Sequence, residues 1–197
     1  MPDDPFSLFG LEPSLALDPD ILESRFRDTS KKWHPDSQTG DAGTFREIGA
    51  ARIILSEAST RIPAALRALG LAESGATGSE NSISTLSEEL MDLFAQLSPA
   101  IQKVEAVARK KTAARSELAL ALLAPEEIAA RRPIEAAGKQ IQSLMDLRLD
   151  LLNDLDRLIK TDDPHPAAKK AHQIARDCAF LERWQKQVRN TLLKLFN

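Results

Sequence analysis

The sequence predicts an all-α protein, and three observations support this fold class. Tyrosine is absent, glycine occurs only 8 times in 197 residues, and the dominant residues are the helix formers Leu, Ala, Glu, Lys and Arg. Long stretches place apolar residues three and four positions apart, which is the spacing of one helix face. Small and polar residues fill 72–82. We therefore predict two helical regions, 1–71 and 83–197, joined by a linker over 72–82.

In the N-terminal region we predict two antiparallel amphipathic helices. The first begins at Asp18-Pro19, a carboxylate N-cap followed by proline, and ends before Pro35. The second follows a polar loop and begins with a capping box of Thr44 and Glu47. The predicted buried positions are Leu22, Phe26, Thr29, Trp33, Phe45, Ile48, Ala51, Ile54, Leu55 and Ala58. We expect short flanking helical segments, Phe6–Leu11 and Ala64–Leu69, to cover the open side of this pair.

The C-terminal region predicts a three-helix bundle, with helices at about 84–123, 125–160 and 166–196. Pro99 lies inside the first helix as a kink or a new helix start. The predicted buried positions of the second helix are Leu144, Arg148, Leu151, Leu155 and Leu158. Those of the third are Ile174, Cys178, Leu181, Gln185, Val188, Leu192 and Leu195. Cys178 is therefore expected to be an inert small hydrophobic residue.

The residues with chemical interest are His34-Pro35-Asp36, which directly follow the first predicted helix. A proline-stiffened turn there would present an imidazole and a carboxylate at one end of the helix pair. The end of that helix is also cationic, and a cationic surface can steer and orient an acidic partner. The cations are Arg25, Arg27, Lys31 and Lys32. The alternatives are a solvated helix end that complements its own dipole and a local turn hydrogen bond at His34 or Asp36.

With this context, residues 4–70 resemble a J-domain. The opening Asp4-Pro5-Phe6-Ser7-Leu8-Phe9-Gly10-Leu11 is similar to that of the HscB family, the J-proteins of iron–sulfur cluster assembly, as are Trp33 before the loop and Arg61 after the second helix. The resemblance implies that His34, Pro35 and Asp36 trigger ATP hydrolysis by a DnaK/HscA-type chaperone. It also implies that the cations of the first helix, including Arg25, Lys31 and Lys32, dock on an acidic surface of that chaperone.

The C-terminal region resembles the same family more loosely, through Leu90–Leu97 and through Ala179-Phe180-Leu181. The resemblance implies a surface for the client, which is the protein handed to the chaperone, and the expected client is an iron–sulfur scaffold protein. Phe180 and Trp184 also lie about 80–120° away from the predicted buried face, so we expect them to be exposed or at a groove edge; packing against a neighbouring helix is the alternative. The predicted client-binding residues are Leu93, Phe94, Leu97, Phe180 and Trp184.

Other classes of function have little support in the sequence. Residues 1–71 hold 11 acidic and 8 basic residues and the remainder 18 of each, without the basic excess of a nucleic-acid binder. No apolar run approaches a membrane span, and one cysteine with three histidines suggests no metal set. We expect a cytoplasmic protein with no cofactor, no membrane partner and no enzymatic activity of its own. A J-protein with a lineage-specific client and a self-associating helical protein with a degenerate J-domain remain alternatives.

Overall fold

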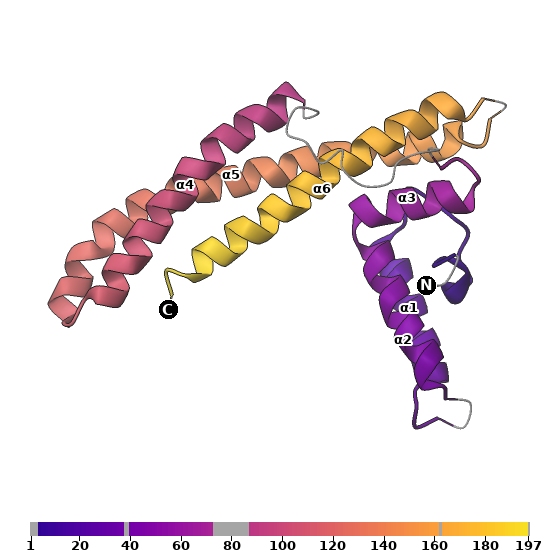
Figure 1. Cartoon of the computed structure of the whole chain (residues 1–197), viewed down its shortest axis with the longest axis horizontal. Helices are drawn as coiled ribbons and strands as arrows, with labels where there is room; N and C mark the ends of the chain where they lie inside the picture. Colours follow the sequence, from indigo (N-terminus) through magenta and orange to yellow (C-terminus); the bar gives the residue numbers. More distant parts are fainter. Residues whose placement is uncertain (1–3, 38–39, 73–86, 162, 197) are drawn as a thin grey trace. The chain divides into compact units, whose positions relative to one another are not determined.

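The protein is all-helical in the computed structural model, which describes residues 4–37, 40–72, 87–161 and 163–196 (Figure 1). These residues form a short 3-10 helix and longer α-helices, and no strand occurs among them. The chain divides into two compact units. The first combines the N-terminal region with Leu147–Ala179, and the second combines the residues before Leu147, from Glu88 onward, with the chain from Phe180. The all-α prediction is therefore confirmed, whereas the predicted linker lies, apart from Ala72, outside the described residues.

The N-terminal region contains η1 (Ser7–Phe9), α1 (Pro19–Trp33), α2 (Ala42–Ser56) and α3 (Ala58–Ala68). Figure 1 shows α1 and α2 side by side, with α3 across their end. Of the predicted buried positions, Leu22, Ile48, Ala51, Leu55 and Ala58 are buried. The other five are only half-buried: Phe26, Thr29, Trp33, Phe45 and Ile54. The segment after α2 is longer than the expected turn, because α3 begins at Ala58 and supplies further core residues. These are Ile62, Ala64, Ala65 and Leu66.

Helix α1 begins and ends as predicted, but α2 begins differently. The Asp18 carboxylate accepts a hydrogen bond from the Asp20 amide at 2.8 Å, and α1 ends at Trp33. The N-cap of α2 is Asp41, whose carboxylate accepts the Thr44 amide at 2.6 Å. The predicted capping box of Thr44 and Glu47 is therefore wrong, because Thr44 is a donor to the cap. A carboxylate three residues before the amide satisfies this helix end.

The C-terminal region contains α4 (Glu88–Ala113), α5 (Glu117–Leu158) and α6 (His165–Leu193). Three helices were predicted, but the first break falls at 114–116 and Pro125 lies inside α5. The reason is Ser116, whose hydroxyl accepts the Ala119 amide at 3.2 Å and so begins α5 early. The predicted inward face of α5 is also partly wrong: Leu151 and Leu158 are exposed, whereas Leu152 and Ile159 are buried.

Within the first unit, side chains of two helices, α3 and α5, form hydrogen bonds with the loop before α1. Buried Arg61 of α3 donates to the Leu15 carbonyl at 3.1 Å and to the Leu55 carbonyl at 3.0 Å. On α5, the Asp156 carboxylate accepts from the amides of Leu15 and Ala16 at 2.7 and 3.1 Å, and from the Ser14 hydroxyl at 2.5 Å. A carboxylate that satisfies three donors stabilises this loop strongly.

Within the described residues, none of the helices combines the length and the apolar character that crossing a bilayer requires.

Candidate functional site: the loop between α1 and α2

The His34-Pro35-Asp36 turn projects from the end of the α1–α2 pair. His34 is the C-terminal cap residue of α1, and the side chains of His34 and Asp36 are 52% and 91% exposed. The Asp36 amide donates to His34 Nδ1 at 3.2 Å, and the Ser37 amide donates to the His34 carbonyl at 2.8 Å. Because Nδ1 accepts, the neutral ring carries its proton on Nε2. The turn therefore fixes the imidazole, and the exposed Asp36 carboxylate lies 3.7 Å from the same Nδ1 atom.

Two further contacts hold this turn, and neither was predicted as part of the site. The ring of Phe45 in α2 lies edge-on to the His34 ring, with 5.4 Å between centroids. The Ser37 hydroxyl donates to the Lys32 carbonyl at 2.9 Å, which closes the end of α1. Gly40 returns against the turn so closely that a Cβ at this position would overlap the His34 carbonyl oxygen. Gly40 therefore belongs to the site because its position leaves no room for a Cβ.

The predicted chaperone-binding cations lie on α1 below this turn. Arg25, Arg27, Lys31 and Lys32 are all exposed, and Lys32 also lies over the Trp33 ring at 5.5 Å. They are therefore exposed cations on the same helix that presents His34, and at about 100° per residue Arg25 and Lys32 lie on one side of that helix while Arg27 and Lys31 lie on another. Their assignment to a chaperone stays a prediction.

Farther along α1, Phe26 joins this helix to α2. The Arg52 guanidinium lies 4.7 Å from the centre of its ring and pairs with Glu23 at 2.9 Å. This cluster links α1 to α2 and therefore stabilises the helix pair that carries the turn.

The predicted client-binding residues lie together in the second unit but are mostly buried. Phe180 and Trp184 are only 5% and 4% exposed, so the expectation that they are exposed is wrong. Trp184 stacks on Phe94 of α4, with ring centroids 5.8 Å apart. Leu93 and Leu97 are buried as well, which leaves Phe94, 39% exposed, as the accessible member. The role of the set in client binding stays a prediction.

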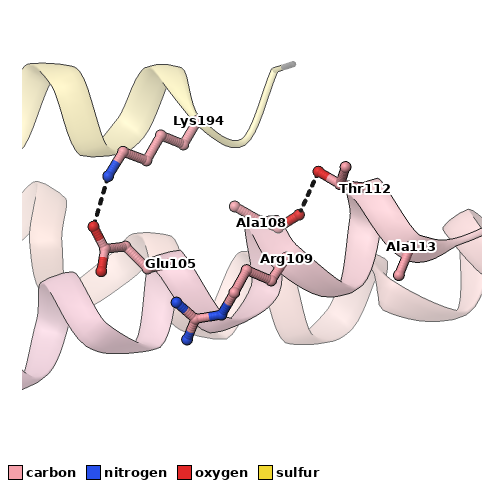
Figure 2. Close-up of a pocket in the computed structure, with 6 residues that line it drawn as sticks. All are labelled: Glu105, Ala108, Arg109, Thr112, Ala113 and Lys194. Carbon is pink, nitrogen blue, oxygen red and sulfur yellow. Dashed lines mark hydrogen bonds and ion pairs between the residues drawn. The ribbon is translucent and has the colours of Figure 1, made fainter.

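A hollow in the surface of the second unit lies on α4 beside the end of α6 (Figure 2). Lys194 and Glu105 pair across it at 2.6 Å. The hydrogen bond and charge of Lys194 lower the pKa of the Glu105 carboxyl below its usual value. The two charged groups pair with each other, so neither of them offers an unpaired charge to a ligand in this hollow. Among the described residues no group of His, Cys, Asp and Glu is arranged to hold a metal ion.

Comparison with known proteins gives no assignment. No protein-family model matches the chain, and no curated protein matches it.

Proposed function

We propose that the protein is a J-domain co-chaperone that binds a DnaK/HscA-type chaperone and stimulates its ATPase. The observation that carries the proposal is the exposed His34-Pro35-Asp36 turn at the end of the α1–α2 pair. The turn is held by backbone hydrogen bonds and by the Phe45 ring, so a partner would meet a preformed surface. Preorganisation of this kind reduces the entropy lost on binding.

The exposed cations of α1 support the same proposal. Arg25, Arg27, Lys31 and Lys32 are exposed along one helix, and such a surface accelerates encounter with an acidic partner in a salt-dependent way. We propose that they orient the chaperone while the turn contacts the region that controls hydrolysis. Stimulation should accordingly weaken as the salt concentration rises.

Asp36→Asn tests the function directly. It removes the charge of a side chain that is 91% exposed, so folding should be unaffected. Stimulation of a purified DnaK-type ATPase should fall by about tenfold or more, the factor that about 1.4 kcal/mol of lost interaction gives. His34→Gln should behave similarly. The measurement is single-turnover ATP hydrolysis with and without the protein.

The matched control is Asp20→Asn, the same chemical change at the opposite end of α1, where Asp20 is also exposed. It should stimulate the ATPase as the unaltered protein does. Full stimulation by Asp36→Asn, with unchanged thermal melting, would contradict the proposed function.

For the client, we propose an iron–sulfur scaffold protein, with a lineage-specific client as second candidate. The burial of Leu93, Leu97, Phe180 and Trp184 favours the second, because a scaffold could reach only Phe94 without a rearrangement. Adding a purified scaffold to the ATPase assay separates the two candidates. Synergistic stimulation would support the scaffold, whereas stimulation unchanged by the scaffold would indicate another client.

A further inference from the structure

The Nδ1 atom of His34 lies close to two groups of Asp36. The Asp36 amide donates a hydrogen bond to this atom at 3.2 Å, and the Asp36 carboxylate lies 3.7 Å from it. An imidazole nitrogen accepts a hydrogen bond when it carries a lone pair and donates one when it carries a proton. The amide is a donor, whereas the carboxylate is an acceptor. The two groups therefore suit opposite protonation states of the same nitrogen.

The neutral form of His34 corresponds to the arrangement in the structure. The amide of Asp36 occupies Nδ1, while the Asp36 side chain is 91% exposed. Two other contacts of His34 do not involve Nδ1, because the ring lies against Phe45 and the backbone carbonyl accepts the Ser37 amide. Neither contact depends on a lone pair at Nδ1, so both hold His34 in place when that atom gains a proton.

Protonation of His34 reverses the preference at Nδ1. The Asp36 amide then faces another N–H group and loses its acceptor. The carboxylate gains an imidazolium donor, and a charge-assisted hydrogen bond of this kind is about 2.7–2.9 Å long. A movement of about 1 Å by the exposed Asp36 side chain is enough to shorten the distance of 3.7 Å to this length. The carboxylate is then bound to the ring and is no longer free to meet a partner.

Helix α2 supplies no competing acceptor for the protonated ring. The residue of α2 that contacts His34 is Phe45, which has no charge. The Asp41 carboxylate before this helix accepts the Thr44 amide, and hydrogen bonds lower its pKa, so it keeps its charge above about pH 5. The Arg46 guanidinium donates to a backbone carbonyl of its own helix. The charges on this side are thus constant and engaged elsewhere.

The end of α1 supplies only cations. Lys31 is exposed, and Lys32 lies over the Trp33 ring at 5.5 Å. Lysine stays charged at neutral and mildly acidic pH and has no acceptor for a protonated imidazole. Within the described residues, Asp36 is the acid that lies at ion-pair distance from His34.

We propose that His34 and Asp36 form a proton-operated switch, in which protonation of the ring replaces the Asp36 amide at Nδ1 with the Asp36 carboxylate and withdraws that carboxylate from the partner. Histidine is the side chain whose charge ordinarily changes between about pH 5 and 8. The effect on a chaperone rests on the proposed co-chaperone function, whereas the exchange within the turn does not. Mild acid should therefore weaken ATPase stimulation.

Nuclear magnetic resonance of the isotopically labelled full chain tests the exchange directly. At about pH 8 the neutral ring should carry its proton on Nε2, and as the pH is lowered to about 5 the Asp36 amide signal should shift with the same midpoint as the His34 ring signals. His34→Gln should abolish this shift, because no group at that position titrates. The matched control is His165→Gln, the same change at another exposed histidine, and it should leave the shift unaltered.

The effect on function is measured as stimulation of a purified DnaK-type ATPase, relative to the chaperone alone at each pH. Stimulation by a peptide substrate of that chaperone, at the same pH values, corrects for titration of the chaperone itself. Between about pH 7.5 and 5.5, stimulation by the protein should fall about two- to fivefold, the range that an exposed ion pair gives.

A neutral ring with its proton on Nδ1, or an Asp36 amide signal that does not follow the ring, would overturn the switch. Stimulation that stays constant while the Asp36 signal shifts would overturn its effect on the chaperone. An absence of stimulation at every pH, with the expected shift of the Asp36 signal, would contradict the co-chaperone function and still support the exchange within the turn. The two proposals can therefore fail separately.

Discussion

Gly40 determines how tightly the loop after α1 can close. Its amide donates to the Ser37 carbonyl at 3.0 Å, and a Cβ there would overlap the His34 carbonyl oxygen and lie 3.0 Å from the Pro35 carbonyl carbon. Both neighbours are backbone atoms, so Gly40→Ala must displace the turn itself. We expect ATPase stimulation to fall by about tenfold while thermal melting changes little, because the affected loop is exposed.

Gly49 provides the control for this prediction. A Cβ at Gly49 meets no atom within 4 Å, and the residue lies inside α2. Gly49→Ala should therefore stabilise the protein by about 0.5–1 kcal/mol through helix propensity and keep full stimulation. If Gly40→Ala and Gly49→Ala stimulate equally, Gly40 does not shape the site.

At the scale of single residues, sequence patterns located the turn but not its supports. His34, Pro35 and Asp36 are contiguous and follow a helix end, so their exposure could be predicted. Gly40 contacts the turn through a close approach that no spacing reveals. The exposure of Phe180 and Trp184 was predicted wrongly because one buried face was assumed for the last helix. Trp184 instead meets Phe94 of α4, on a second face.

The start of helix α2 gives the protein a defined acid sensitivity. Hydrogen bonds from Thr44 lower the pKa of the Asp41 carboxyl below its ordinary value. A carboxylate with a lowered pKa stabilises the folded state above its unfolded pKa of about 3.9, and this contribution is lost as pH falls through the folded value. Asp41→Asn keeps a capping oxygen without the charge. We expect its melting temperature to be lower than that of the unaltered protein near neutral pH.

The difference in melting temperature between Asp41→Asn and the unaltered protein should shrink as the pH is lowered through the pKa of the folded Asp41 carboxyl. Thermal melts followed by circular dichroism at several acidic pH values would measure this change. Asp20→Asn, in the first turn of α1, serves as a comparison because Asp20 caps no helix in this way. A difference for Asp41→Asn that stays constant down to strongly acidic pH would show that the cap does not titrate.

At the scale of elements, the bounds of a helix could be predicted where an N-cap residue and a periodic apolar face indicate the same start. Helix α1 has both, at Asp18-Pro19 and Leu22, and its bounds were right. The start of α5 was misplaced because Pro125 is a stronger signal in sequence than Ser116. In the structure, Ser116 caps the helix and Pro125 is accommodated inside it. Leu118, Leu120 and Leu122 at the start of α5 are exposed. The apolar pattern there therefore did not reveal which face of the helix is buried.

Across the first unit, Asp156 joins α5 to the loop before α1. Asp156→Ala leaves the amides of Leu15 and Ala16 without their acceptor, and we expect it to destabilise the protein by about 2 kcal/mol. Hydrogen exchange should show these two amides losing protection, while those in the middle of α1 keep it.

The neighbouring carboxylate of Asp154 tests the specificity of this effect. Its pair with Arg157, at 3.4 Å, is largely exposed, so Asp154→Ala should change stability by about 0.5 kcal/mol or less. Equal effects of the two substitutions would indicate that helix charge, and not the loop contact, is responsible.

The organisation of the whole molecule was the least predictable. The polar stretch 72–82 predicts two regions that follow one another along the chain, and that division stays a prediction. The first compact unit, however, takes in Leu147–Ala179 as well. A contact such as that of Asp156 with Ala16 links residues 140 positions apart, and local patterns carry no information on such pairs.

The separation of 140 residues in the sequence also affects how the chain folds while it is made on the ribosome. Residues 14–16 are made about 140 residues before their acceptor on α5. At about 5–20 residues per second, the nascent N-terminal helices would wait for roughly 7–28 seconds before Asp156 could join them. Once Arg61 has been made, it can donate to the Leu15 carbonyl for the rest of that interval. The order of synthesis thus leaves the N-terminal unit unfinished until the last helices emerge.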